Sequence, residues 1–167
     1  MANVKTAYGA ASNLTITLAS LASDTNLLAG QASTAVDESS AGNLDELLAG
    51  FIANGTTPTA GKEIDVYVYG SIDDVPTYPD GITGTNAAKT MTSVNILNSG
   101  LKLAASMTIT ANTGEKNYFG PISVRSLFGG ILPKKWGVFV VHNSVSALNA
   151  TGGNHQITNT PVYETTI

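Results

Sequence analysis

Hydrophobic and polar positions alternate along much of this chain, a pattern that indicates β-strands. The clearest case is residues 63–70, EIDVYVYG, in which Ile64, Val66 and Val68 share one face of an extended segment. Asp65 and two tyrosines occupy the opposite face, because successive side chains of a strand point to opposite sides. Glycines bound the segment at both ends, so we predict a strand with one face in the core.

Two further segments show the same spacing of two. Residues 13–20, NLTITLAS, predict a half-buried strand with leucine and isoleucine on one face and threonine on the other. Residues 101–112, LKLAASMTITAN, predict one long strand or two strands joined by a bend of small residues. The large apolar residues of this segment fall at odd positions, so we expect them on a single face. They are Leu101, Leu103, Met107 and Ile109.

The stretch KKWGVFVVHN, residues 134–143, differs because it is apolar on both faces. One face carries Trp136 and two valines, and the opposite face carries Phe139 and a third valine. A strand of this kind lies at the centre of a sheet that is covered on both sides, or it faces a partner subunit. We therefore predict a central strand that ends at His142.

Two segments allow more than one interpretation. In residues 43–55, NLDELLAGFIANG, leucines and a phenylalanine recur at helical spacing, but Gly50 interrupts the run and strands are expected on both sides. We favour a strand over a short helix here. Residues 155–167, HQITNTPVYETTI, are extended and β-branched, and Pro161 places them at a sheet edge or bulge. The last residues are expected to pair as an edge or to exchange with a neighbouring subunit.

Together these segments predict the fold class. About eight or nine short strands, glycine-rich turns and very little helix are typical of an antiparallel, jelly-roll-like β-sandwich. We predict a single domain over residues 1–167, with residues 1–12 as a candidate extended N-terminal arm. A threonine-rich open edge in such a fold is an aggregation hazard, so we expect assembly to cover it.

The composition of the chain restricts the kinds of partner and chemistry that we expect. Only 12% of the residues are charged, about half the roughly 25% usual in soluble globular proteins. The net charge of −4, with eight Lys and Arg, disfavours direct nucleic-acid binding. No cysteine is present, which excludes disulfides and thiolate chemistry. We expect a soluble protein without signal peptide or contact with a membrane, because polar residues interrupt every apolar run.

The two histidines are the first candidates for chemistry. His142 and His155 flank the polar loop of residues 143–154 and could approach each other. A metal site requires a third and usually a fourth ligand, and this loop contains neither cysteine nor acid. No nucleophile elbow and no phosphate-binding glycine loop occurs in the sequence. We expect His142 and Asn143 to end a strand and to hydrogen-bond loop backbone groups, and we expect no catalytic, cofactor-binding or metal site.

Acidic residues give a second candidate site. Asp73, Asp74 and Asp80 share one loop and could offer oxygen ligands to Ca²⁺, but their spacing does not match a calcium-binding loop. Solvated turn acids are the favoured interpretation. We interpret two adjacent acidic pairs as surface charge: Asp37 with Glu38, and Asp45 with Glu46.

Aromatic residues could in principle form a platform for sugars. The candidates are Tyr67, Tyr69, Tyr78, Tyr118 and Trp136. Because Tyr67 and Tyr69 stand opposite the core-facing residues of their strand, we expect them to be exposed or at an interface. For Trp136 we expect the core. A carbohydrate-binding module is therefore an alternative function.

Three segments resemble structural proteins of tailed bacteriophages: SNLTITLASLAS (12–23), GTTPTAGKEIDVYVYGSIDD (55–74) and SLFGGILPKKWGVFVVHNSVSALNATGGNHQITNTPVYETT (126–166). The resemblance implies a virion component without enzyme activity, and it supplies no site motif.

A compact β domain with a weakly charged surface suits a capsid decoration or cement protein. Such a protein stabilises the assembled head by binding it. We therefore expect a non-enzymatic protein at the capsid surface of the virion, made in the host cytoplasm. Its expected partners are the major capsid protein and copies of itself. The alternatives are a tail or head-to-tail component and a glycan- or receptor-binding module.

Overall fold

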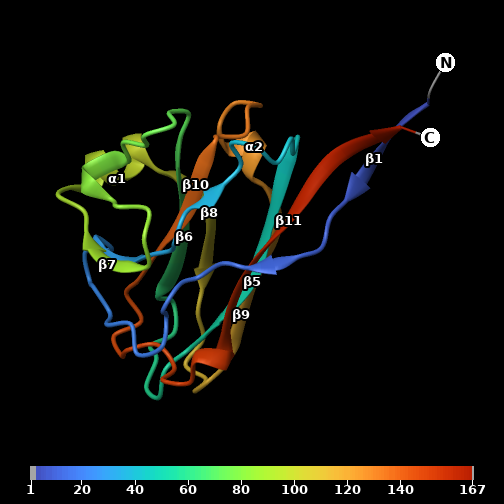
Figure 1. The fold of residues 1–167 in the computed structure, drawn as a ribbon. Coiled ribbons are helices and arrows are strands. Elements are labelled where there is room, and N and C mark those ends of the chain that lie inside the picture. Colours follow the sequence, from blue (N-terminus) through green and yellow to red (C-terminus); the bar gives the residue numbers. More distant parts are fainter. Residues whose placement is uncertain (1–2, 167) are drawn as a thin grey trace.

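The chain folds into an all-β sandwich of two antiparallel sheets, as expected from the alternation in its sequence. The structure is a computed structural model that describes residues 3–166 (Figure 1). The five-stranded sheet contains β1 (Val4–Tyr8), β2 (Ser12–Asn13), β5 (Asp45–Ala53), β9 (Lys116–Ser123) and β11 (His155–Thr166). The six-stranded sheet contains β3 (Ala29–Ala32), β4 (Val36–Asp37), β6 (Glu63–Ser71), β7 (Ala87–Thr90), β8 (Lys102–Thr108) and β10 (Lys135–His142).

Helical elements are few and short, also as expected. They are the α-helices α1 (Val94–Gly100) and α2 (Val124–Leu127) and the 3₁₀ turns η1 (Pro79–Gly81) and η2 (Gly152–Asn154). The described residues form eleven strands rather than eight or nine. The difference comes from short strands such as β2 and β4, two residues each, which the sequence pattern is too brief to indicate.

The chain passes repeatedly from one sheet to the other. The five-stranded sheet has the order β1-β11-β5-β9, with β2 also paired to β11, and the six-stranded sheet has the order β7-β3-β10-β6-β8, with β4 also paired to β10. As a result, strands that follow one another in sequence, such as β5 and β6 or β9 and β10, lie on opposite sides of one core.

That core confirms the predicted faces of the two central strands. Ile64, Val66 and Val68 of β6 and Trp136 and two valines of β10 are fully buried in one cluster between the sheets. Leucine and isoleucine side chains of the five-stranded sheet complete it from the other side. Burial of each such side chain stabilises the fold by about 1.5–3 kcal/mol.

A second apolar cluster lies on the outer face of the six-stranded sheet. Phe139 and Val141 of β10 contribute to it, together with Tyr67 and Tyr69 of β6. They are covered by the chain itself, through an excursion over residues 78–101 that we call the covering segment. Its buried residues are Tyr78, Ile82, Met91, Leu97 and Leu101. Figure 1 shows α1, β7 and the adjoining loops beside this sheet.

The covering segment corrects one expectation and explains another. Tyr67 and Tyr69 are 7% and 0% exposed, so the prediction that they are exposed or at an interface is wrong. β10 is central and apolar on both faces because its own chain, rather than a partner subunit, covers the second face. Trp136 is in the core, as predicted.

Tyr69 also explains the glycine inside the most apolar strand. Gly137 of β10 pairs directly with Tyr69 of β6, and the tyrosine Oη donates a hydrogen bond of 2.7 Å to the carbonyl oxygen of Ser33. A Cβ atom at position 137 would lie 2.3 Å from Oη and 2.4 Å from Cζ of Tyr69. Only glycine leaves room for the ring to reach Ser33, directly after β3.

Residues 13–20 form a strand only at their beginning, so most of that prediction is wrong. Leu14 N donates to Ile157 O in the five-stranded sheet, whereas Thr15 O accepts from Thr34 N beside the six-stranded sheet. The segment therefore crosses from one sheet to the other. Its alternation is real, because Leu14 and Leu18 are buried in the central core.

The odd-numbered residues of 101–112 do not share one face, which corrects a second prediction. The register between β6 and β8 shifts at Ala104, which has no direct partner while its neighbours Leu103 and Ala105 do. Such a bulge reverses the faces of the residues that follow. Leu101 thus packs in the outer cluster, and Met107 packs in the central core.

Residues 45–53 form strand β5, as favoured over a helix. β11, in contrast, is not an edge strand over most of its length, because β5 flanks one side and β1 and β2 flank the other. Pro161 lies at the break between β1 and β2. Its carbonyl accepts a hydrogen bond from Gly9 N, and its missing N–H costs no ladder bond at that break.

The end of β11 and β1 leave the sandwich together. β1 pairs with β11 over residues 162–166, whereas β5 pairs with β11 only as far as Val162. Residues 4–8 and 163–166 therefore form a two-stranded ribbon, which Figure 1 shows projecting from the sandwich towards the labelled termini. The candidate arm, residues 1–12, begins outside the described residues, and its described part includes β1 and the start of β2.

Candidate functional site

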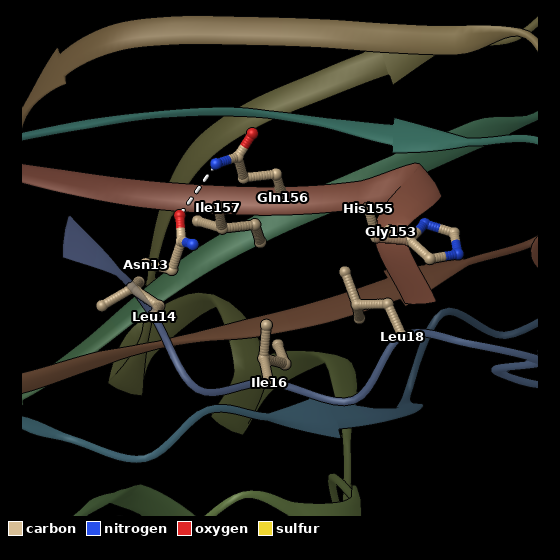
Figure 2. Close-up of a pocket in the computed structure, with 8 residues that line it drawn as sticks. All are labelled: Asn13, Leu14, Ile16, Leu18, Gly153, His155, Gln156 and Ile157. Atoms are coloured by element: carbon tan, nitrogen blue, oxygen red, sulfur yellow. Dashed lines mark hydrogen bonds between the residues drawn. The ribbon is translucent and has the colours of Figure 1, made fainter. Parts of the chain in front are cut away.

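A recess lies where the crossing segment meets the start of β11. Its volume is about 390 Å³. Leucine and isoleucine side chains line one side, and polar groups of β11 line the other (Figure 2). The lining residues are Asn13, Leu14, Ile16, Leu18, Gly153, His155, Gln156 and Ile157. Its volume is within the range of small-molecule pockets. Whether the recess can bind or act on a ligand therefore depends on whether its polar groups are free to contact one.

The polar groups that line the recess already form hydrogen bonds within the protein. Gln156 Nε2 donates to Asn13 Oδ1 at 2.8 Å (Figure 2). His155 Nε2 lies 2.8 Å from the carbonyl oxygen of Asn149, so it donates, and Nδ1 accepts from Ala53 N at 3.3 Å. Burial lowers the pKa of His155, which favours this neutral form. Neither ring nitrogen points to a reacting group.

His142 is buried at the end of β10, where the sequence placed the end of a strand. Its Nε2 donates to the carbonyl oxygen of Leu21 at 3.0 Å, and Nδ1 lies 2.8 Å from Ser144 Oγ. Asn143 Oδ1 accepts from Glu63 N at 2.7 Å. Burial lowers the pKa of His142. These contacts tie loops to strand ends, as expected of His142 and Asn143.

Two of the three loop aspartates, Asp74 and Asp80, are engaged separately. Asp74 forms an ion pair of 2.8 Å with Lys134, and Asp80 accepts hydrogen bonds from the backbone N–H and hydroxyl of Thr92. These hydrogen bonds lower the pKa of Asp80. Between residues 3 and 166, no group of three histidine, aspartate or glutamate side chains could hold a metal ion. The geometry gives no support to a calcium site at Asp73, Asp74 and Asp80.

Glu46 contradicts the interpretation of the acidic pairs as surface charge. It is 1% exposed and accepts hydrogen bonds of 3.0 Å from the amides of Asn43 and Asn159. Asn43 also donates to Glu38 at 2.7 Å. Burial raises the pKa of Glu46 to about 7, and the nearby charge of Glu38 acts in the same direction. The other pair is more accessible, and Asp37 forms an ion pair of 3.2 Å with Lys135.

The outer face of the five-stranded sheet is accessible to a partner. We call it the open face. Its residues alternate with the buried residues of β5, β9 and β11. They are Leu47, Ala49, Phe51, Tyr118, Gln156, Thr158, Thr160 and Val162, with Lys116 at one end and Asp45 at the other.

An aromatic pair marks one end of the open face. The ring centroids of Phe51 and Tyr118 are 5.5 Å apart, and Lys116 Nζ lies 4.2 Å from the centroid of the Phe51 ring. Tyr118 is 70% exposed. Tyr118 is thus the one member of the predicted sugar platform that the structure leaves strongly exposed, since Tyr67, Tyr69, Tyr78 and Trp136 are buried.

Comparisons of the chain with protein-family models, with curated proteins and with solved structures gave no match. Over the described residues, no helix has the length and apolar character needed to span a membrane.

Proposed function

We propose that this protein is a non-enzymatic structural component of a tailed bacteriophage virion. In this role it decorates the capsid, binds the major capsid protein and stabilises the assembled head. The observation that carries the proposal is the open face, an accessible surface of β-strands that is apolar or hydroxyl-bearing over most of its extent.

The chemistry of the open face suits docking to a protein shell. Its charged residues lie at the two ends, Lys116 and Asp45, so contact over the middle removes few charges from water. Desolvation of unpaired charge is the main cost of burying a polar surface. Threonine hydroxyls can exchange water for protein partners, and Phe51 and Tyr118 supply the aromatic contacts enriched at interfaces.

Strand order adds support at the level of the fold. We infer a jelly roll, an arrangement found in viral capsid and lectin domains. When the short β4 and β7 are set aside and β1 and β2 are counted as one, eight strands remain. The first, eighth, third and sixth strands then form one sheet, and the second, seventh, fourth and fifth form the other. The resemblance of three sequence segments to phage structural proteins supports the same family of roles.

The copy number of this chain on purified particles tests the proposal. A decoration protein is expected in a number that matches the shell subunits or their junctions. A single ring of copies at the portal or tail would contradict decoration and favour a tail or head-to-tail component. A particle reconstruction would show in the same experiment whether the open face touches the shell.

A surface variant tests the face itself. Tyr118→Glu places a charge in the aromatic pair and is expected to abolish binding of the purified chain to undecorated heads. Val75→Glu is the matched control, because Val75 is 86% exposed in a loop away from this face. Equal binding by both variants would contradict docking through the open face.

The exposed aromatic pair also favours a second candidate, a glycan-binding module. Tyr118 and Phe51 could stack against a sugar ring beside Lys116. Binding on a glycan array that Tyr118→Ala abolishes would support this function. Absence of binding by the wild-type chain on such an array would exclude it for the glycans tested.

A further inference from the structure

The outer edge of β1 has no partner strand among residues 3–166. β1 is the end strand of the five-stranded sheet, and its inner edge pairs with β11. Beyond Val162 the ribbon consists of these two strands alone. Two-stranded ribbons are marginally stable in water, and a free edge of N–H and C=O groups is a template for another strand.

The hydrogen-bond pattern shows which backbone groups lie on this edge. Gly9 N donates to Pro161 O at 2.8 Å, so the backbone groups of Gly9 point towards β11. The direction of the backbone N–H and C=O groups alternates along a strand. The backbone groups of Lys5 and Ala7 therefore also point towards β11. The residues whose N–H and C=O groups point outward are Val4, Thr6 and Tyr8.

We propose that two copies of this chain pair through β1, antiparallel about a two-fold axis that passes through Thr6. In this register Thr6 faces Thr6 of the second copy, and Val4 faces Tyr8 of the second copy. Every outward N–H of one β1 then meets an outward C=O of the other. The two ribbons become one four-stranded ribbon, with β1 no longer at an edge.

The side chains favour this register over the one centred on Lys5. Val4 is 59% and Tyr8 is 65% exposed, and pairs of an aromatic with a β-branched residue stabilise adjacent strands, as do pairs of threonines. Lys5 lies opposite Ala7 of the second copy. A two-fold axis moved to Lys5 would instead place two lysines opposite each other, which is destabilising.

A register-specific cross-link tests the pairing. Because the chain has no cysteine, Thr6→Cys introduces a single thiol. Directly opposed residues of a hydrogen-bonded antiparallel pair have Cα atoms about 5.5 Å apart, within the range of a disulfide. Mild oxidation is expected to yield a covalent dimer of Thr6→Cys and none of the control Lys5→Cys. Equal cross-linking of both variants, or of neither, would overturn the proposed register.

Mass measurements test the pairing without a covalent bond. We expect the wild-type chain to show twice its mass of 17.1 kDa in sedimentation over a series of concentrations. Thr6→Pro removes an outward N–H but no bond of the β1–β11 ladder, and it is expected to give the single-chain mass. Glu164→Pro, directly opposite on β11, removes an N–H from the far edge of the same ribbon and should leave the dimer intact.

A single-chain mass for the wild type at every concentration would overturn pairing of two copies. A partner of another kind, such as a shell subunit, would then be expected at the β1 edge. Binding of the chain to heads is a separate measurement made through the open face, so failure of this dimer would leave the proposed function untouched.

Discussion

Gly137 of the central strand β10 has no room for a side chain. Replacement by alanine would place a Cβ atom 2.3–2.4 Å from the phenol end of Tyr69 and 2.8 Å from Ser33 Oγ. The ring cannot retreat without losing its hydrogen bond to Ser33 O. We expect Gly137→Ala to lower the free energy of unfolding by about 1–3 kcal/mol, the usual cost of an overpacked core, as measured by urea denaturation.

Gly152 provides the control for that substitution. It lies in η2, and nothing lies within 4 Å of a Cβ atom at this position. Gly152→Ala is therefore expected to change stability by less than about 1 kcal/mol. Equal stabilities for the two variants would contradict the packing of Tyr69 across Gly137.

At the scale of elements, the covering segment keeps the outer face of the six-stranded sheet out of water. Leu97 of α1 is 2% exposed and packs in the outer cluster with Tyr67 and Phe139. We expect Leu97→Ala to lower the free energy of unfolding by about 2–5 kcal/mol through the cavity it leaves. Hydrogen exchange should also accelerate in β7 and α1 before it does in β10, because the segment would detach locally.

Val94 serves as the comparison within the same helix. It is 50% exposed, so Val94→Ala removes apolar atoms that already contact water. We expect little change in stability or exchange from this variant. Uniformly faster exchange across β6, β8 and β10 in Leu97→Ala would show that the covering segment and the sandwich unfold as one unit.

The elements predicted best from the sequence are strands that stay in one sheet, because the alternation of their residues then assigns each face. The faces of β6 and β10 follow from alternation alone, and Ile64, Val66 and Trp136 lie where the pattern places them. Residues 13–20 alternate equally well, but their backbone partners lie far apart, at Ile157 of β11 and at Thr34 between β3 and β4. Alternation reports burial, whereas strand pairing depends on neighbours far away in the sequence.

Local departures from regular pairing account for the other errors. A single extra residue, Ala104, reverses the faces of β8, and alternation gives no signal for a bulge among small residues. The burial of Tyr67 and Tyr69 depends on the covering segment, which is contributed by a later part of the chain. Their exposure could not be judged from their own strand.

The burial of Glu46 is predictable from the sequence, but grouping it with its neighbour Asp45 concealed the pattern. Once residues 45–53 are taken as a strand, Glu46 and the core residue Leu48 must share a face. Treating Asp45 and Glu46 as a pair obscured this alternation. The amides of Asn43 and Asn159 that donate hydrogen bonds to Glu46 come from a loop and from β11. Nothing in the local sequence links these two asparagines to Glu46.

For the whole molecule, buried groups give opposing dependences of stability on pH. Burial lowers the pKa of His142 and of His155 from 6.5, so the unfolded chain binds more protons below pH 6.5 and stability falls as pH decreases. The pKa of Glu46 is raised from 4.5 to about 7. The folded chain retains that proton longer, so stability falls as pH rises from 4.5 to about 7. Burial also raises the pKa of Asp65, which acts in the same direction as Glu46.

These opposing dependences can be separated at Glu46, because its ionisation between pH 4.5 and about 7 costs about 3 kcal/mol while the histidines act in the other direction. Glu46→Gln removes the ionisable group, so in urea denaturation at about pH 5.5, 6.5 and 8 we expect the stability of this variant to rise more steeply with pH than that of the wild type. Glu164→Gln, exposed on the ribbon, should follow the wild type. An unchanged pH dependence in Glu46→Gln would mean that another buried acid, with Asp65 the first candidate, opposes the histidines.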